Sequence, residues 1–268
     1  MLKTVALSPT PTRFGPILFA GRLEEGLPLV RRAGLDGVEL SLPNPKKVDF
    51  DLLLSLLRKH GLEVSTIATG QSFYEEGVSL SHPDPKVREE AVRRIGVFLD
   101  FASKLGARVI IGGIRGRTAQ GAPTKEEWER FVKALEECVR MAERKGATLL
   151  LEPINRYETN LVNTVREAME LVSRIGSERL RILPDTFHMN IEEASMEGSI
   201  VEAGDLVGGL HVADSNRLAP GWGHIDFAPI GRALKEAKAA EFVCAEILPK
   251  PDDVSALEKA SDFLKNFP

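Results

Sequence analysis

The feature that most constrains the fold is a recurring junction, in which a helix-like stretch ends at a glycine and a short apolar run follows. The junction occurs in four segments, RKHGLEVSTIA (58–68), SKLGARVIIGG (103–113), ERKGATLLLEP (143–153) and SRIGSERLRILPD (173–185). Glycine after the last helical turn adopts the left-handed conformation that closes a helix. The Val, Ile and Leu runs are nearly continuous, which is typical of parallel strands buried on both faces.

The same pattern, followed along the whole chain, predicts eight strands separated by amphipathic stretches. The strands are expected near 4–8, 37–41, 63–68, 108–112, 148–152, 180–185, 207–212 and 242–247. Apolar residues recur at every third or fourth position in stretches such as 87–105 and 125–145, as they do in amphipathic helices. Asp84-Pro85 and Pro123-Thr124 are typical helix starts.

Eight strands alternating with eight helices predict the α/β class, as a single-domain (β/α)₈ TIM barrel over residues 1–268. The length of 268 residues suits this fold, which typically needs about 250. No linker or low-complexity run suggests a second domain. A doubly wound open sheet is the alternative, but no G-x-G-x-x-G follows the first strand.

Composition limits the cellular environments and the classes of partner that are expected for this chain. The chain has no apolar stretch near the ~20 residues that cross a bilayer, and its short N-terminal apolar run does not resemble a signal peptide. Cys138 and Cys244 lie in apolar runs rather than at metal-ligand spacing, so a reducing cytoplasmic location is expected. The net charge of −4 argues against a nucleic-acid partner, because phosphate binding needs a basic face.

Polar residues end four consecutive predicted strands. Active sites of such barrels lie at the C-terminal ends of the strands. The four residues are Glu152 after LLL, Asp185 in RILPD, His211 in GGLHVADSN and Glu246 in FVCAEIL. One buried carboxylate is explained equally well as a salt-bridged core group. Four such side chains converging at one end of a barrel instead favour a divalent cation, for which Mn, Mg, Co and Zn all suit the ligands.

Longer motifs around these residues resemble a known family. They are LEPINRYETNLVNT (151–164), LPDTFHMNIEE (183–193), LHVADSNRLAPGWGHIDFAPI (210–230) and AEILP (245–249). They are similar to the ketose 3-epimerase branch, which acts on tagatose, psicose and related ketoses. This branch belongs to the sugar phosphate isomerase/epimerase superfamily of xylose isomerase-like TIM barrels. Residues 67–91 and 110–117 are more similar to a subgroup acting on keto-sugar acids, such as 5-keto-L-gluconate epimerase.

The resemblance implies a metal-dependent epimerase that inverts C3 of a ketose or keto-sugar acid. One divalent ion, Mn²⁺ or Co²⁺ with Mg²⁺ or Zn²⁺ as alternatives, would bind Glu152, Asp185, His211 and Glu246. The substrate would chelate this ion through its C2 carbonyl and C3 hydroxyl oxygens. Glu152 and Glu246 would also act as acid and base on opposite faces of C3, through a cis-enediolate. Two carboxylates are the minimum for inverting a stereocentre by proton transfer.

The resemblance also implies substrate contacts and an assembly. His188 would contact the substrate O2, and Arg217 and Glu158 would bind other substrate oxygens. For His188, the alternative is a histidine that caps a short helix after the sixth strand. Relatives of this kind are homodimers or homotetramers, which is the expected assembly, with no membrane partner.

The sequence does not assign a single role to several other loop residues. Arg115 and Arg117 follow the fourth predicted strand, where either could hold a substrate carboxylate or bind nothing. Asn155 is expected to support the site or fix its loop. Trp222 is placed either in the sugar pocket or in loop packing, and His224 has no assigned role.

Three rival functions remain on the same barrel. An aldose–ketose isomerase, of the hydroxypyruvate or xylose isomerase type, would use the same metal but move a proton between C1 and C2. An apurinic-site endonuclease needs extra histidines for its zinc cluster, and the third and fourth predicted strands end in ATGQ and IGGI, without histidine. A binding protein on an inactive barrel is disfavoured because all four ligands are present.

Overall fold

Eight parallel strands form the centre of the molecule. The computed structural model describes residues 1–119, 121–238 and 240–268. Within this part of the chain the strand order is β6-β5-β4-β3-β2-β1-β8-β7. The strands are β1 (Leu2–Leu7), β2 (Gly37–Ser41), β3 (Glu63–Ala68), β4 (Arg108–Ile111), β5 (Leu149–Leu151), β6 (Leu180–Ile182), β7 (Leu210–Val212) and β8 (Phe242–Ala245).

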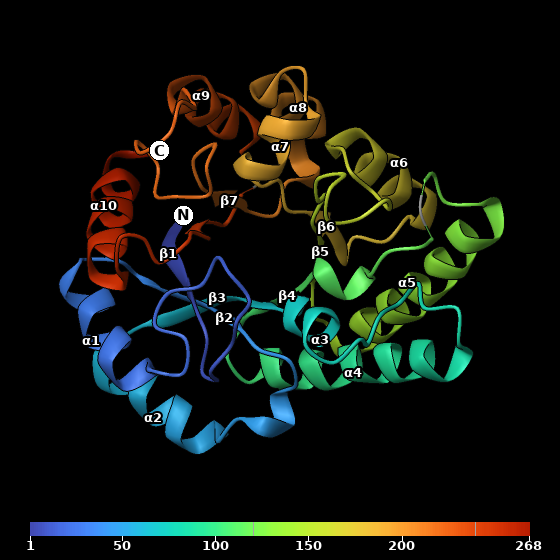
Figure 1. Ribbon diagram of the computed structural model, residues 1–268, viewed down its shortest axis with the longest axis horizontal. Coiled ribbons are helices and arrows are strands. Elements are labelled where there is room, and N and C mark those ends of the chain that lie inside the picture. The colour runs from blue at the N-terminus through green and yellow to red at the C-terminus, as the bar shows by residue number, and fades with distance from the viewer. Residues whose placement is uncertain (120, 239) are drawn as a thin grey trace.

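Backbone hydrogen bonds also connect the two ends of this sheet. Gly208 N donates to Ile182 O at 2.8 Å, and His211 N donates to Pro184 O at 2.9 Å. An isolated bridge pairs Asp185 with His211. The sheet therefore closes into the predicted (β/α)₈ barrel, with its helices arranged as a ring around the strands (Figure 1).

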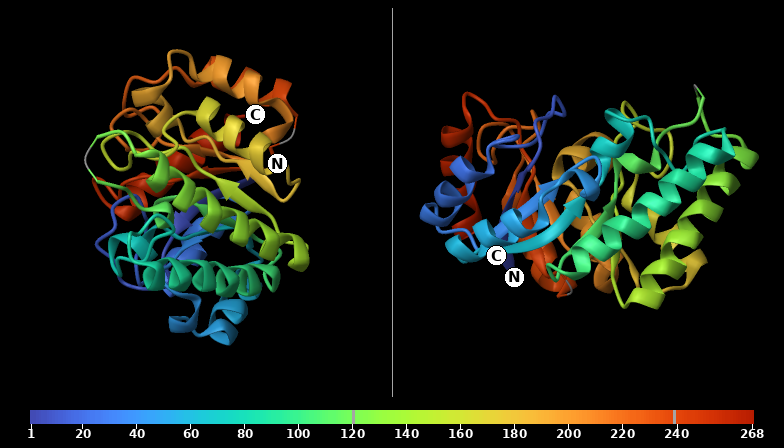
Figure 2. Two further views of the ribbon diagram at one scale, coloured as in Figure 1. Left: turned by 90° about the vertical axis from the view of Figure 1, so that its right-hand side faces the viewer. Right: turned by 90° about the horizontal axis from the view of Figure 1, so that it is seen from below.

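The outer ring contains one helix after each strand. These are α1 (Leu23–Arg32), α2 (Phe50–His60), α4 (Pro85–Ser103), α5 (Lys125–Lys145), α6 (Val165–Ile175), α8 (Met196–Ala203), α9 (Phe227–Ala237) and α10 (Asp253–Asn266). The neighbouring helices α4 and α5 lie side by side on the outside of the barrel (Figure 2).

The connections after β3 and β6 each carry an additional short helix, of which the sequence analysis considered only the one after the sixth strand. These are α3 (Gly70–Tyr74) and α7 (Thr186–Glu192). Both begin where the chain leaves its strand, so both lie at the end of the barrel where the site is expected. Three 3₁₀ turns complete the described elements, η1 (Pro45–Lys47), η2 (Gly113–Arg115) and η3 (Gly204–Leu206).

The predicted helix starts and stops are confirmed by their hydrogen bonds and dihedral angles. Asp84 Oδ1 accepts from Lys86 N at 2.9 Å, and Thr124 forms a reciprocal capping box with Glu127. All four junction glycines have a positive φ, namely Gly61, Gly106, Gly146 and Gly176. At Gly61, Gly146 and Gly176 the left-handed residue is the C-cap that ends the helix, whereas α4 ends at Ser103 with Lys104 as its cap, and Gly106 lies in the turn that follows.

Alternation along the strands divides the core into two parts. Residues that point outward pack against the helices in one large apolar cluster, which includes Leu149 and Leu151 of β5. Residues that point inward form a smaller cluster inside the barrel, Ala6, Ala68, Ile110, Leu150, Leu183, Phe242 and Cys244. The inward positions continue towards the C-terminal ends of the strands, so the strand-end residues face the barrel axis.

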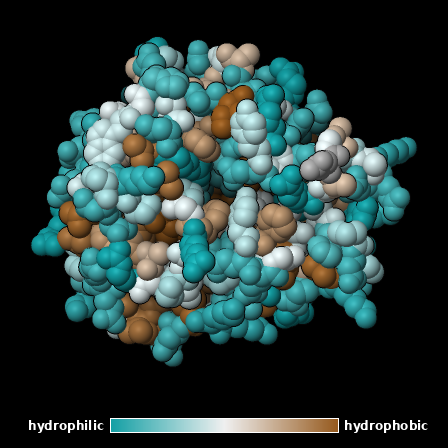
Figure 3. Space-filling view, in the orientation of Figure 1, coloured by the Kyte–Doolittle hydropathy of each residue, from teal (hydrophilic) through white to brown (hydrophobic). Residues whose placement is uncertain are grey.

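The remaining features concern the cysteines, the apolar character of the helices and the surface. Cys138 and Cys244 are both free and buried. None of the described helices combines the length and the apolar character needed to cross a membrane. Hydrophilic side chains predominate on the face drawn in Figure 3, and apolar ones occur there in small groups.

Candidate active site

The four predicted ligands lie together at the C-terminal ends of β5 to β8. The ligand atoms of Glu152, Asp185, His211 and Glu246 lie within 4.8 Å of one another, and all four side chains are buried. His211 Nδ1 is 3.0 Å from Glu152 Oε1, 3.7 Å from Glu246 Oε2 and 3.9 Å from Asp185 Oδ2. Neighbouring strands therefore contribute one side chain each to a single cluster, as the sequence predicts.

Local structure explains how two of these carboxylates are held. Leu150 of β5 points into the barrel, so Glu152, two residues later, also faces inward. Gly112 makes room for it, because a Cβ at that position would lie 2.4 Å from Glu152 Oε2. Asp185 is the N-cap of α7, and its Oδ1 accepts from Phe187 N at 2.8 Å.

A buried glutamate on β2, which the sequence analysis missed, orients His211. Glu39 Oε2 lies 2.9 Å from His211 Nε2 and accepts from Thr66 Oγ1 at 2.6 Å. Glu39 is fully buried. With Nε2–H directed at Glu39, the Nδ1 lone pair of a neutral ring points into the carboxylate cluster. The sequence signal that could have revealed Glu39 was a glutamate between Val38 and Leu40, at an inward position of the strand predicted over 37–41.

The charges in the cluster shift its pKa values in opposite directions. Burial alone would lower the pKa of His211, but Glu39, Glu152 and Glu246 raise it well above its usual value. Burial, together with the nearby Glu152 and Asp185, raises the pKa of Glu246 well above its usual value, against the charges of Arg217 and His211. A cation among these side chains would favour the ionised carboxylates and replace a proton on His211 Nδ1.

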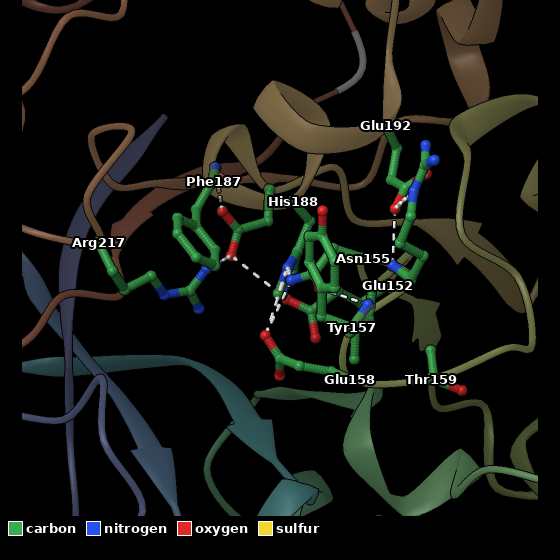
Figure 4. A network of polar contacts seen from close by, with 12 residues as sticks. Glu152, Asn155, Tyr157, Glu158, Thr159, Phe187, His188, Glu192 and Arg217 are labelled. Carbon is green, nitrogen blue, oxygen red and sulfur yellow. Dashed lines mark hydrogen bonds and ion pairs between the residues drawn. The ribbon is translucent and has the colours of Figure 1, made fainter.

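Arg217 lies beside the cluster and pairs with two of its carboxylates. Its Nη1 donates to Asp185 Oδ2 at 2.7 Å, and its Nη2 is paired with Glu246 Oε2. The guanidinium carbon lies 4.6 Å from the centre of the Phe187 ring (Figure 4). The backbone of Arg217 has a φ of 63°, a left-handed conformation that is costly for a residue with a side chain.

The loop around Arg217 holds this conformation in place. Arg217 N donates to Asp214 O at 2.8 Å, and Leu248 N donates to Arg217 O at 2.9 Å. The second bond connects the loop after β7 with the segment after β8. Backbone and side-chain contacts together therefore direct the guanidinium at the cluster.

His188 and Glu158, predicted to bind substrate, lie on the other side of the cluster. His188 Nε2 is 3.9 Å from Asp185 Oδ2, and His188 Nδ1 is 2.8 Å from Asn155 Nδ2. Burial lowers the pKa of His188 to about 4, against the charge of Asp185, so the ring is neutral near pH 7. Glu158 Oε2 accepts from the hydroxyl of Tyr74 at 3.2 Å.

A cavity of about 190 Å³ lies directly against these side chains. Glu152, Glu246 and His188 belong to its lining. Phe14 and Tyr74 also line the cavity, and their rings are stacked with centroids 4.9 Å apart. The cavity thus joins an ionisable cluster to an aromatic wall, an arrangement that suits a small polar ligand.

The structure shows where the residues lie to which the sequence analysis assigned no single role. Arg115 is fully buried and its Nη2 donates to Glu152 O at 2.7 Å, so it supports the end of β5 rather than lining the cavity. Arg117 is exposed. Trp222 is half-buried against the core. His224 is exposed and contacts Ser215 Oγ at 2.9 Å.

The fold and the site together define a (β/α)₈ barrel with a candidate metal centre at the C-terminal ends of its strands. The chain belongs to the family of xylose isomerase-like TIM barrels, whose family model matches residues 27–267.

Within this family, the chain is similar to several individual 3-epimerases. The chain is 36% identical to an L-ribulose 3-epimerase of Mesorhizobium japonicum over 214 residues, which cover 79% of this chain and 71% of the relative. It is 32% identical to a D-psicose 3-epimerase of Ruminiclostridium cellulolyticum over 214 residues, covering 77% and 72% of the two chains. A solved structure of an L-ribulose 3-epimerase superposes with a TM-score of 0.84 at 28% identity, covering 97% and 93%.

Proposed function

We propose that this protein is a divalent-metal-dependent epimerase that inverts C3 of a ketose or keto-sugar acid. The observation that carries the proposal is the meeting of Glu152 and Glu246 in one buried cluster that lines a small cavity. Two carboxylates beside one substrate-sized space are what inversion by proton transfer requires. The relatives named L-ribulose and D-psicose 3-epimerases support the same reaction class.

The donor set of the cluster fits one divalent cation. Three carboxylates and one imidazole, all buried, offer ligand atoms within 4.8 Å of one another. Arg217 offsets only one of the three negative charges, and a divalent cation would offset the rest. When bound, the ion would act as a Lewis acid that stabilises negative charge on substrate oxygens. Mn²⁺ and Co²⁺ are the proposed ions, and Mg²⁺ and Zn²⁺ also suit these ligands.

Glu152 and Glu246 are the proposed catalytic residues. One carboxylate removes the proton from C3, which leaves an enediolate spread over C2 and C3. The other delivers a proton to the opposite face of C3, so that the configuration is inverted. The roles exchange when the other epimer is the substrate, because the reaction runs in both directions through the same intermediate.

The remaining predicted site residues bind and orient the substrate in this proposal. His188, neutral near pH 7, donates a hydrogen bond to O2, where negative charge develops. Arg217 and Glu158 bind other substrate oxygens. The stacked rings of Phe14 and Tyr74 line one wall of the cavity and limit the access of water to the enediolate. The expected homodimer or homotetramer and the cytoplasmic location stay predictions.

The test of this function is the position of hydrogen exchange. The protein is incubated in D₂O with Mn²⁺ or Co²⁺ and a panel of free ketoses and keto-sugar acids, and the products are analysed by NMR. The proposal predicts deuterium at C3 of the epimerised product. An aldose–ketose isomerase would instead place deuterium at C2 of an aldose product and at C1 of the recovered ketose, with none at C3. Several zinc ions per chain, measured by elemental analysis, would favour the endonuclease class.

A further inference from the structure

We propose that Asn155 is a positioning residue that fixes His188 as the Nε2–H tautomer and holds the carboxylate of Glu158. Through this one amide, the cavity presents the Nε2–H of His188 as a donor and the carboxylate of Glu158 as an acceptor, both in fixed positions. The catalytic consequence rests on the proposed epimerase function, whereas the tautomer is a property of the chain alone.

The orientation of the Asn155 amide is determined by its backbone neighbour. Asn155 Oδ1 accepts from Tyr157 N at 3.0 Å, and a backbone N–H can only donate. The oxygen of the amide must therefore face Tyr157, and the nitrogen must face the other way. Nδ2 then directs its two hydrogens at His188 Nδ1, 2.8 Å away, and at Glu158 Oε1, 2.9 Å away (Figure 4).

This contact decides which nitrogen of His188 carries the proton. An amide N–H opposite Nδ1 requires an unprotonated, accepting nitrogen. The contact excludes the Nδ1–H tautomer and the imidazolium, since both would place two hydrogens between the same pair of atoms. The proton of the ring is therefore on Nε2, the nitrogen nearer to Asp185 Oδ2 at 3.9 Å. Asn155 and His188 are only 2% and 4% exposed, so water does not readily replace this bond.

Glu158 is held by the same amide and by one further group. Its Oε1 accepts from Asn155 Nδ2, and its Oε2 accepts from Tyr74 Oη at 3.2 Å. Each carboxylate oxygen keeps a free lone pair that can accept from a substrate hydroxyl. His188 thus offers an N–H to an oxygen that gains negative charge, while Glu158 accepts from a hydroxyl.

The backbone around Asn155 supplies an isosteric test. The bond from Tyr157 N to the side-chain oxygen of Asn155 is an Asx turn, which aspartate forms equally well. Asn155→Asp therefore keeps the turn and the side-chain shape but removes both N–H donors. Asn163→Asp is the matched control in the same loop, because the Asn163 amide instead donates to Ile154 O and Thr159 O at 2.7 and 3.0 Å.

The direct readout is the tautomer itself, measured by ¹⁵N NMR of the histidine rings at pH 7. The Mg²⁺-loaded protein is used because Mg²⁺ is diamagnetic, and the loss of one signal in His188→Gln assigns the ring. The wild-type protein is expected to show a protonated Nε2 and an unprotonated Nδ1. Asn155→Asp is expected to move a proton onto Nδ1, whereas Asn163→Asp leaves the ring unchanged. A wild-type ring protonated at Nδ1, or at both nitrogens, would overturn the proposal without any variant at Asn155.

Kinetics test whether the tautomer serves the reaction. Asn155→Asp is expected to lower kcat by about tenfold to a hundredfold, the usual cost of losing a group that orients a site residue. KM is expected to change much less, because the donor acts on charge that develops in the transition state. A wild-type kcat in Asn155→Asp would overturn the positioning role. If the tautomers behave as expected but no substrate exchanges at C3, the proposed epimerase function fails and the tautomer assignment stands.

Discussion

The two halves of the barrel contribute different things to the site. The ends of β5 to β8 supply Glu152, Asp185, His211 and Glu246, the four side chains of the candidate metal centre. The ends of β1 to β4 supply space and an apolar wall, through residues such as Gly112 and the stacked pair Phe14 and Tyr74. One half therefore carries the chemistry and the other shapes the cavity in which it takes place.

Glu39 connects the halves. It lies on β2, in the half that otherwise shapes the cavity, yet its carboxylate contacts His211 Nε2 across the interior of the barrel at 2.9 Å. Changes in the two halves should consequently be distinguishable. Changes to the cluster residues at the ends of β5 to β8, the chemical half, should stop proton transfer. Changes at the ends of β1 to β4, the shaping half, should displace or weaken site groups that remain present.

The largest effect is expected in the chemical half. Glu152→Gln and Glu246→Gln should each lower kcat for epimerisation by at least 10²-fold to 10⁴-fold, the range contributed by a positioned acid or base. The amide keeps the size of the side chain but cannot accept a proton. Steady-state assays at saturating Mn²⁺, with the bound metal quantified, provide the measurement. Glu241→Gln, an exposed carboxylate at the start of β8, is the control, and substantial activity in either site variant would contradict the two-carboxylate mechanism.

Crowding the shaping half should have the next largest effect. Gly112→Ala places a Cβ 2.4 Å from Glu152 Oε2, so the carboxylate must move. A displacement of about 1 Å in a reacting group can cost about 10²-fold in rate, and we expect a kcat loss of that order. Gly96→Ala in α4 is the control, because its Cβ would meet only the flexible Met141 side chain, at 3.3 Å. Equal kcat values for the two variants would show that Gly112 is not needed for space.

Loss of the link between the halves should weaken metal binding. Glu39→Gln removes the charge that faces His211 Nε2 and should reduce Mn²⁺ or Co²⁺ affinity by about tenfold to a hundredfold. Metal titration followed by calorimetry measures this change independently of turnover. Glu63 is exposed at the N-terminal end of β3, far from the site at the C-terminal ends of the strands. The Glu63→Gln protein should therefore bind metal like the wild type. An unchanged affinity in Glu39→Gln would mean that His211 is oriented by its packing alone.

The smallest effect should come from a carboxylate of the chemical half that has no chemical role. Asp214 is buried, and its carboxylate accepts from Ser215 N, Gly221 N and Ile225 N at 2.8, 2.7 and 3.1 Å. Burial would raise its pKa, but these hydrogen bonds lower it below the usual value. Asp214→Asn should therefore cost about 1 kcal/mol of unfolding free energy at pH 7.

The pH dependence of this effect has a defined sign. Because the folded pKa of Asp214 is lowered, its stabilisation is present above the unfolded value of about 3.9 and is lost as pH falls through the folded pKa. Denaturant unfolding of the wild type and Asp214→Asn should differ at pH 7 and converge below about pH 4. Asp262→Asn, on the exposed face of α10, should show little difference at either pH. A difference that persists at low pH would assign the effect to packing rather than to the charge.

Strand periodicity made the fold and the central cluster predictable. Once Glu152, Asp185, His211 and Glu246 are each assigned to the end of a consecutive strand, closure of the barrel brings them together without further information. The helix boundaries at Asp84 and Thr124 were readable for a similar reason, because a cap acts within its own turn.

Features that depend on the distances between different strands were not predictable. Glu39 lies in the middle of β2, so its contact with His211 depends on the width of the barrel interior. The need for a glycine at 112 depends on where the Glu152 carboxylate lies. The left-handed backbone of Arg217 has no signature in the sequence, because glycine or asparagine is the residue expected there.

The central claim is that Glu152 and Glu246 act on opposite faces of one carbon. The most direct test is to deuterate C3 of each epimer separately and to follow wash-out of the label in H₂O with Glu152→Gln and with Glu246→Gln, at saturating metal. We predict that each variant releases deuterium from one epimer and not from the other, and that the two variants release it from opposite epimers. Release from the same epimer by both variants, or from both epimers by either variant, would contradict the assignment of one carboxylate to each face.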